Sequence, residues 1–110
     1  MKQYVIDELR PADYRKIKSY LDEKFRSSPL DGIYWIPLDA DQHSGVQAEH
    51  TTCQPFYFAI DLEANMMACE LLIRTKARIQ CECISYATER QRNWLIGFVD
   101  RMFKKLDIKT

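Results

Sequence analysis

Glycine is scarce in this sequence, with three residues among 110. A glycine-rich run whose backbone N–H groups would cradle a phosphate is missing, so we do not expect nucleotide binding of that kind. Net charge is also missing, because 16 basic residues balance 16 acidic ones. This balance gives no long-range attraction to nucleic acid or to an anionic membrane surface, and it removes repulsion between copies of the chain.

Long hydrophobic runs are missing as well. No segment approaches the roughly 18 apolar residues that cross a membrane. The opening residues, MKQYVIDELR, carry acids where an export signal needs an uninterrupted apolar stretch. We therefore expect a cytoplasmic protein without a membrane partner, whose four cysteines are reduced thiols. These cysteines include no Cys-x-x-Cys pair, the spacing typical of redox motifs and of many zinc sites.

What the sequence does contain is an ordinary globular composition. Hydrophobic residues make up 46% of the chain and charged residues 29%. A chain of this length buries roughly two-thirds of its unfolded surface and needs no disulfide or metal to do so. We expect residues 1–110 to form a single domain.

Two segments have helical periodicity. Pro11 suits the first position of a helix, where its missing N–H has no intrahelical partner to lose. Thr88 and Gln91 have the spacing of a capping box, which predicts the start of a second helix near the C-terminus. The expected apolar face of the first helix consists of Tyr14, Ile17, Leu21 and Phe25, and that of the second of Leu95, Phe98, Val99, Met102 and Leu106.

Four strands are predicted between the helices. IYWIPL, residues 33–38, has β-branched and aromatic residues, and Pro37 places this strand at a sheet edge. Residues 54–84 predict three antiparallel strands joined by tight turns near residues 64–65 and 75–77. The implied register pairs Cys69 with Ile60, Leu71 with Phe58, Ile73 with Phe56, Cys83 with Cys69, Cys81 with Leu71, and Ile79 with Ile73.

The order of these elements predicts an α+β fold, an antiparallel sheet of about four strands with the N- and C-terminal helices packed on one face. The sheet face that carries the phenylalanines is the only large apolar surface available to the helices. In the predicted register Cys69, Cys81 and Cys83 also point to this face. We therefore interpret these three thiols as small hydrophobic core residues.

Both histidines lie in the connection between the edge strand and the next strand, DADQHSGVQAEHTTC, residues 39–53. His43, His50 and Cys53 are side chains that suit zinc, and the acids of this connection would add oxygen ligands. The spacing of these residues matches no recurrent zinc motif. A metal site at His43, His50 and Cys53 therefore competes with the interpretation of residues 39–53 as a solvated loop.

Two other groups carry weaker hypotheses. Glu70 and Glu82 lie opposite each other in the predicted register, which permits acid–base chemistry but equally a charge cluster neutralised by Arg74. Trp94, with arginines nearby on the C-terminal helix, would suit stacking on a nucleic-acid base, although Glu89 and Asp100 dilute the positive charge.

The sequence indicates no reaction class. Our main hypothesis is a small cytosolic binding or interaction module without catalytic activity, forming a homodimer and open to a protein partner. One alternative is a metal-binding protein or metal-dependent enzyme with its site in residues 39–53, for which zinc is the one expected cofactor. Another is a weak nucleic-acid binder that uses the C-terminal helix.

Overall fold

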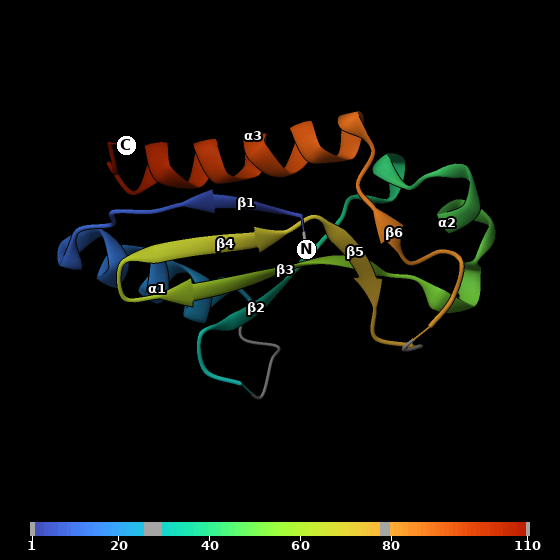
Figure 1. Ribbon diagram of the computed structural model, residues 1–110, viewed down its shortest axis with the longest axis horizontal. Coiled ribbons are helices and arrows are strands. Elements are labelled where there is room, and N and C mark those ends of the chain that lie inside the picture. The colour runs from blue at the N-terminus through green and yellow to red at the C-terminus, as the bar shows by residue number, and fades with distance from the viewer. Residues whose placement is uncertain (1, 26–29, 78–79, 110) are drawn as a thin grey trace.

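The computed structural model describes residues 2–25, 30–77 and 80–109. Within them, six strands form an antiparallel sheet in the order β1-β4-β3-β5-β6, and β2 pairs with β3 (Figure 1). The strands are β1 (Gln3–Ile6), β2 (Ile33–Pro37), β3 (Phe56–Glu63), β4 (Met66–Glu70), β5 (Leu72–Thr75) and β6 (Ser85–Tyr86). The α-helices are α1 (Pro11–Phe25), α2 (Gly45–Glu49) and α3 (Glu89–Lys105).

The predicted α+β class is confirmed, with six strands in place of about four. The additional strands β1 and β6 have only four and two residues, too short to give a clear periodic signal. β2 is an edge strand that ends at Pro37, as predicted. α1 begins at Pro11, and α3 has the predicted capping box between Thr88 and Gln91.

The two long helices pack on the same face of the sheet. Ile17 of α1 and Leu95 of α3 are fully buried in one hydrophobic cluster with Phe58 and Ile60 of β3. The helices also touch each other, because the rings of Phe25 and Phe98 lie 5.8 Å apart. Alternate residues of β3, namely Phe56, Phe58, Ile60 and Leu62, are buried and create the apolar face that the helices cover.

The predicted register holds at the turn and then shifts. Ile60 pairs with Cys69 as expected, but Phe56 pairs with Thr75 rather than with Ile73. The predicted single strand is therefore interrupted between β4 and β5. From Cys69 to Thr75 it has two more residues than the facing stretch of β3 from Phe56 to Ile60. Such an insertion bends the strand while keeping the same side chains inward, and Ile73 and Thr75 are both buried.

Leu71 lies at this interruption, and its predicted pairing with Phe58 is wrong. Its N–H donates to the carbonyl of Lys2, and its carbonyl accepts from the N–H of Ala87. The backbone of Leu71 thus joins the N-terminal segment to the segment just before α3. These two distant parts of the chain satisfy the hydrogen bonds that we had assigned to β3.

The predicted third strand of this meander is also wrong. Cys69 pairs with Tyr4 of β1, so the N-terminal strand takes the edge of β4 that we had given to residues 79–84. Residues 81–84 form a turn, in which the N–H of Ile84 donates to the carbonyl of Cys81. The predicted pairing of Ile79 falls outside the described residues. Cys81 and Cys83 therefore do not face Leu71 and Cys69.

The connection from β2 to β3 is more ordered than the predicted loop. It contains two 3-10 turns, η1 (Ala40–Gln42) and η2 (Thr51–Cys53), on either side of α2. Ser44 caps α2, and Gln47 completes a capping box with it. α2 and β6 lie at the end of the molecule away from the C-terminus (Figure 1).

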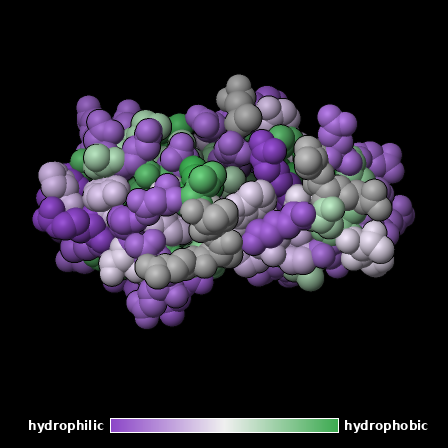
Figure 2. Space-filling model, turned by 90° about the horizontal axis from the view of Figure 1, so that it is seen from below, coloured by the Kyte–Doolittle hydropathy of each residue, from purple (hydrophilic) through white to green (hydrophobic). Residues whose placement is uncertain are grey.

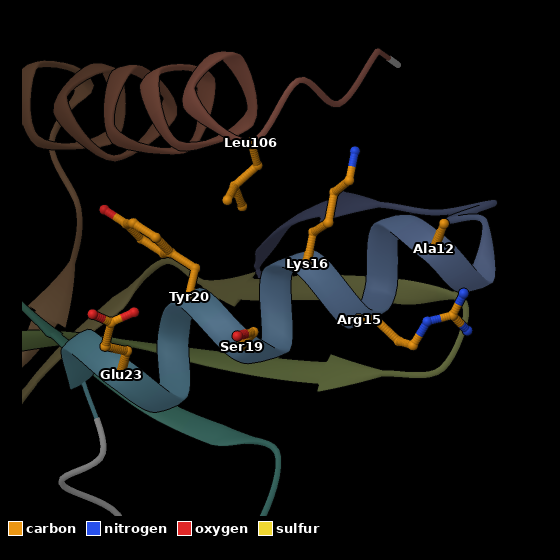
Figure 3. A pocket seen from close by; sticks show the side chains of 7 residues that line it. All are labelled: Ala12, Arg15, Lys16, Ser19, Tyr20, Glu23 and Leu106. Carbon is orange, nitrogen blue, oxygen red and sulfur yellow. The ribbon is translucent and has the colours of Figure 1, made fainter.

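The face seen in Figure 2 is mainly hydrophilic, with hydrophobic residues in small areas. A groove of about 570 Å³ lies between α1 and the residue that follows α3, where Tyr20 and Leu106 supply apolar surface and Lys16 lies at the rim (Figure 3). In the described part of the chain, no helix is both long enough and apolar enough to span a membrane.

Candidate metal centre

Four metal-ligating side chains meet at the end of the molecule where α2 and β6 lie. The ligand atoms of His50, Cys53, Cys81 and Cys83 all lie within 4.8 Å of one another. Two of these residues come from the connection between β2 and β3, and two from the turn before β6. The fold therefore joins two short sequence pairs, His50-x-x-Cys53 and Cys81-x-Cys83, into one cluster.

Local hydrogen bonds fix the first pair. The N–H of His50 closes the last turn of α2 by donating to the carbonyls of Val46 and Gln47. The N–H of Cys53 donates in turn to the carbonyl of His50, which brings the two side chains to the same side of η2. The hydroxyl of Thr75 on β5 donates to the carbonyl of Cys53 and so ties this segment to the sheet.

The second pair is held by the turn and by a buried glutamine. The turn from Cys81 to Ile84 leads directly into β6, which pairs with β5. The side-chain amide of Gln47 donates a 3.3 Å hydrogen bond to the carbonyl of Cys83. Gln47 thus connects α2, which carries His50 at its end, to the turn that carries the two thiols.

His50 has a different partner at each ring nitrogen. Its Nδ1 lies 3.2 Å from the sulfur of Cys81, and its Nε2 lies 3.3 Å from a carboxylate oxygen of Glu82. If Nδ1 is the ligand atom, Nε2 carries the ring proton and donates a hydrogen bond to the carboxylate of Glu82. A carboxylate on the far side of a ligating imidazole fixes its tautomer and orientation and raises its basicity.

The thiols differ in electrostatics and in access to solvent. Hydrogen bonding from the backbone of Cys83, followed by contacts with the side chains of Cys83, His50 and Cys53, lowers the pKa of Cys81 to about 7. Burial raises the pKa of Cys83. Cys53 and Cys83 are buried, whereas Cys81 and His50 are partly exposed. The cluster therefore lies just beneath the surface, with Cys81 and His50 on its open side.

This donor set suits a four-coordinate zinc ion. Three thiols and one imidazole form a Cys₃His set, one of the recurrent structural zinc sets. Zinc–sulfur bonds of about 2.3 Å place ligand sulfurs roughly 3.8 Å apart in a tetrahedron. The spread of 4.8 Å among the ligand atoms therefore leaves a closing movement of about 1 Å at the longest edge.

The structure brings together two of the three residues that we had proposed as ligands. His50 and Cys53 belong to the cluster, but His43 does not. The ring of His43 packs edge-on against Phe56, with centroids 5.0 Å apart. Within the described residues, its buried Nε2 atom has no hydrogen-bond partner. Burial lowers the pKa of His43, which favours the neutral ring at this position.

The cysteines follow the prediction only in part. Cys69 lies in the core as expected, fully buried on β4, and burial raises its pKa to about 12. Cys83 is also buried in the core, and Cys81 is partly buried against it, but both reach the cluster from the turn at residues 81–84 and not from the predicted strand. The two pairs that form the cluster were visible in the sequence, but neither has a recurrent zinc spacing by itself.

The weaker hypotheses lose their geometric basis. Glu70 accepts a hydrogen bond from Arg74 and pairs across the sheet with Gln3, whereas Glu82 lies beside His50, so the two carboxylates are not opposite each other.

Trp94 is engaged in packing. Its ring stacks with Phe58 and with Phe98 at centroid distances of 6.1 Å, and its indole N–H donates to Asp39. The ring that we had considered for base stacking therefore forms part of the contact between α3 and the sheet.

Comparisons of the chain with protein-family models, with curated proteins and with solved structures gave no match.

Proposed function

We propose that this protein binds one zinc ion through His50, Cys53, Cys81 and Cys83 and that the ion has a structural role. The observation that carries the proposal is the convergence of four ligand atoms within 4.8 Å from two separate segments. Thiolates and imidazoles are the donors that zinc favours, and a set rich in thiolates disfavours hard ions such as calcium and magnesium.

The number of ligands supports a structural rather than a catalytic role. Catalytic zinc sites keep one position open for water or substrate, whereas structural sites are closed by four protein side chains. Four side chains are available here, so the protein itself would complete the tetrahedron. This proposal keeps the metal-binding hypothesis drawn from the sequence, moves its centre to a different ligand set, and does not require enzymatic activity.

The ion would join two segments that are built from short elements. α2 and η2 consist of five and three residues, and β6 of two. Elements this short depend on tertiary contacts for their stability. A zinc ion bonded to both segments would fasten them to each other and, through Thr75 and Gln47, to the sheet. The rest of the molecule would then serve as the binding module of our main hypothesis. That this module forms a homodimer and binds a protein partner is part of the same proposal.

The test is native mass spectrometry of protein purified without a metal-affinity tag and kept reduced. We expect about one zinc ion per chain in the wild type. The C53S and C83S variants are expected to bind zinc at least tenfold more weakly. Two matched controls remove a thiol or an imidazole outside the cluster, namely C69A and H43L, and both are expected to retain the ion.

Two outcomes would overturn the proposal. One is a wild-type protein that remains metal-free when zinc is supplied in excess under reducing conditions. The other is zinc that is lost from H43L but retained by C53S. This result would mean that His43, and not the cluster, provides the ligand. Circular dichroism of each variant shows whether the fold is retained, so that a loss of zinc is not confused with unfolding.

A further inference from the structure

The thiols of the cluster differ in their access to solvent. Cys53 and Cys83 are 2% and 1% exposed, whereas Cys81 is partly exposed at the start of the turn that precedes β6. The sulfur of Cys81 is also in contact with those of Cys53 and Cys83. An accessible thiol beside two buried ones is the arrangement of an attacked cysteine with a resolving partner at hand.

We propose that the zinc centre is a redox-sensitive site, in which Cys81 is oxidised by a peroxide and a disulfide from Cys81 to one of the two buried thiols releases the ion. The inference rests on the proposed zinc site and adds its regulation. Its basis is geometric: Cys81 is the sulfur that a small oxidant in solvent reaches, and both resolving sulfurs already lie within the cluster.

The chemistry balances with hydrogen peroxide as the oxidant. The sulfur of Cys81 attacks one peroxide oxygen, the O–O bond breaks, and the products are a sulfenic acid on Cys81 and, after proton uptake, one water molecule. The sulfur of Cys53 or Cys83 then attacks the sulfur of Cys81, the S–O bond breaks, and a second water molecule leaves. Overall, two thiolates give up two electrons, and peroxide takes up those electrons and two protons.

Release of the ion follows from the loss of ligands. A disulfide sulfur is a poor zinc ligand compared with a thiolate, so one disulfide leaves His50 and a single thiolate to hold the ion. A reducing thiol would cleave the disulfide and restore the full set. Cys69 takes no part in this exchange, because it is fully buried on β4 among the core residues.

The experiment begins with protein that has been shown by elemental analysis to contain zinc. Hydrogen peroxide is added, and a chromophoric chelator in solution reports the released ion. Mass spectrometry of peptides, with free thiols blocked beforehand, identifies the disulfide. We expect release to accompany a disulfide that contains Cys81, and we expect dithiothreitol with added zinc to restore the bound ion.

Variants separate the role of Cys81 from general damage. C81H keeps a zinc ligand at this position but removes the accessible thiol, so we expect it to bind zinc and to release it to peroxide about tenfold more slowly. C69A removes a thiol outside the cluster and is expected to release zinc at the wild-type rate.

The outcomes distinguish the two proposals. Wild-type protein that never binds zinc contradicts the proposed function itself. Zinc-loaded protein that keeps its ion in peroxide, or that releases it without a disulfide at Cys81, leaves the zinc site standing and overturns the redox inference. Equal rates of release in C81H and wild type would overturn it as well.

Discussion

The side-chain amide of Gln91 donates a 2.9 Å hydrogen bond to the side-chain oxygen of Gln47 in the interior of the protein. Each glutamine is also the third helical residue of a capping box, Gln47 with Ser44 and Gln91 with Thr88. The same amide of Gln91 donates to the carbonyl of Gln42. One pair of buried amides thus joins the starts of α2 and α3, and Gln47 extends the network to Cys83 in the candidate metal centre.

Replacement of Gln91 tests this network. Q91A removes one half of a capping box, the donor to the carbonyl of Gln42, and one of the two donors to the side-chain oxygen of Gln47, which still accepts from the N–H of Ser44. We expect it to lower the free energy of unfolding by about 2 kcal/mol or more. The measurement is urea unfolding of reduced, zinc-saturated protein, followed by circular dichroism.

A second glutamine provides the matched control. Gln54 donates only long hydrogen bonds, of 3.3 and 3.4 Å, to carbonyls of α2. Q54A is therefore expected to cost about 0.5 kcal/mol. If Q91A and Q54A lower the free energy of unfolding equally, the hydrogen bonds between Gln91 and Gln47 contribute no more to stability than the long ones of Gln54.

Much of the framework that holds these glutamines could be predicted from local sequence. Pro11 predicted the first residue of α1, and Thr88 with Gln91 predicted the capping box of α3. Ser44 and Gln47 have the same spacing, so the same rule would have found α2 within the supposed loop. These signals are reliable because the two partners of a cap lie within one turn of each other.

The candidate metal centre could be predicted only in part, because its assembly depends on pairing between distant strands. Residues 79–84 alternate as a strand does, and the local pattern alone favoured a third strand beside β4. In the structure, the edge of β4 pairs instead with β1, which lies near the N-terminus of the chain. That long-range choice turns Cys81 and Cys83 toward His50, and nothing within residues 79–84 encodes it.

The carboxylate beside His50 leads to a second prediction. Glu82 lies 3.3 Å from His50 Nε2, and its side chain is largely exposed, so its replacement has little effect on packing. E82Q is expected to weaken zinc affinity about tenfold, because the neutral amide oxygen of glutamine is a weaker acceptor for the imidazole N–H than a carboxylate and orients the ring less firmly. Titration of zinc against a competing chelator measures the change.

Glu49 supplies the control for this variant. It precedes His50 in the sequence and is exposed at the end of α2. E49Q makes the same change in charge and is expected to leave zinc affinity unchanged. Equal losses in E82Q and E49Q would mean that net charge near the site, rather than the contact with His50, controls binding.

His43 leads to a prediction about pH. Burial lowers its pKa in the folded protein below the ordinary value, so the unfolded chain takes up a proton first as the pH falls. Stability linked to His43 is therefore fully present above the unfolded pKa of about 6.5 and decreases as the pH falls below it. In H43L this contribution is absent, and we expect a flatter dependence.

Urea unfolding of metal-free wild type and H43L, compared at about pH 7.5 and pH 5.5, measures this difference. The use of chelator in both samples removes the contribution of zinc ligands. A wild-type protein that loses no more stability than H43L between these pH values would show that His43 does not titrate differently on folding.

The central claim is that zinc is held by three sulfur atoms and one nitrogen atom of this chain. X-ray absorption at the zinc edge of the reduced, zinc-loaded protein measures the ligand atoms directly. The account predicts about three sulfur ligands near 2.3 Å and one nitrogen ligand near 2.0 Å. A first shell of nitrogen and oxygen atoms, with one sulfur or none, would contradict it.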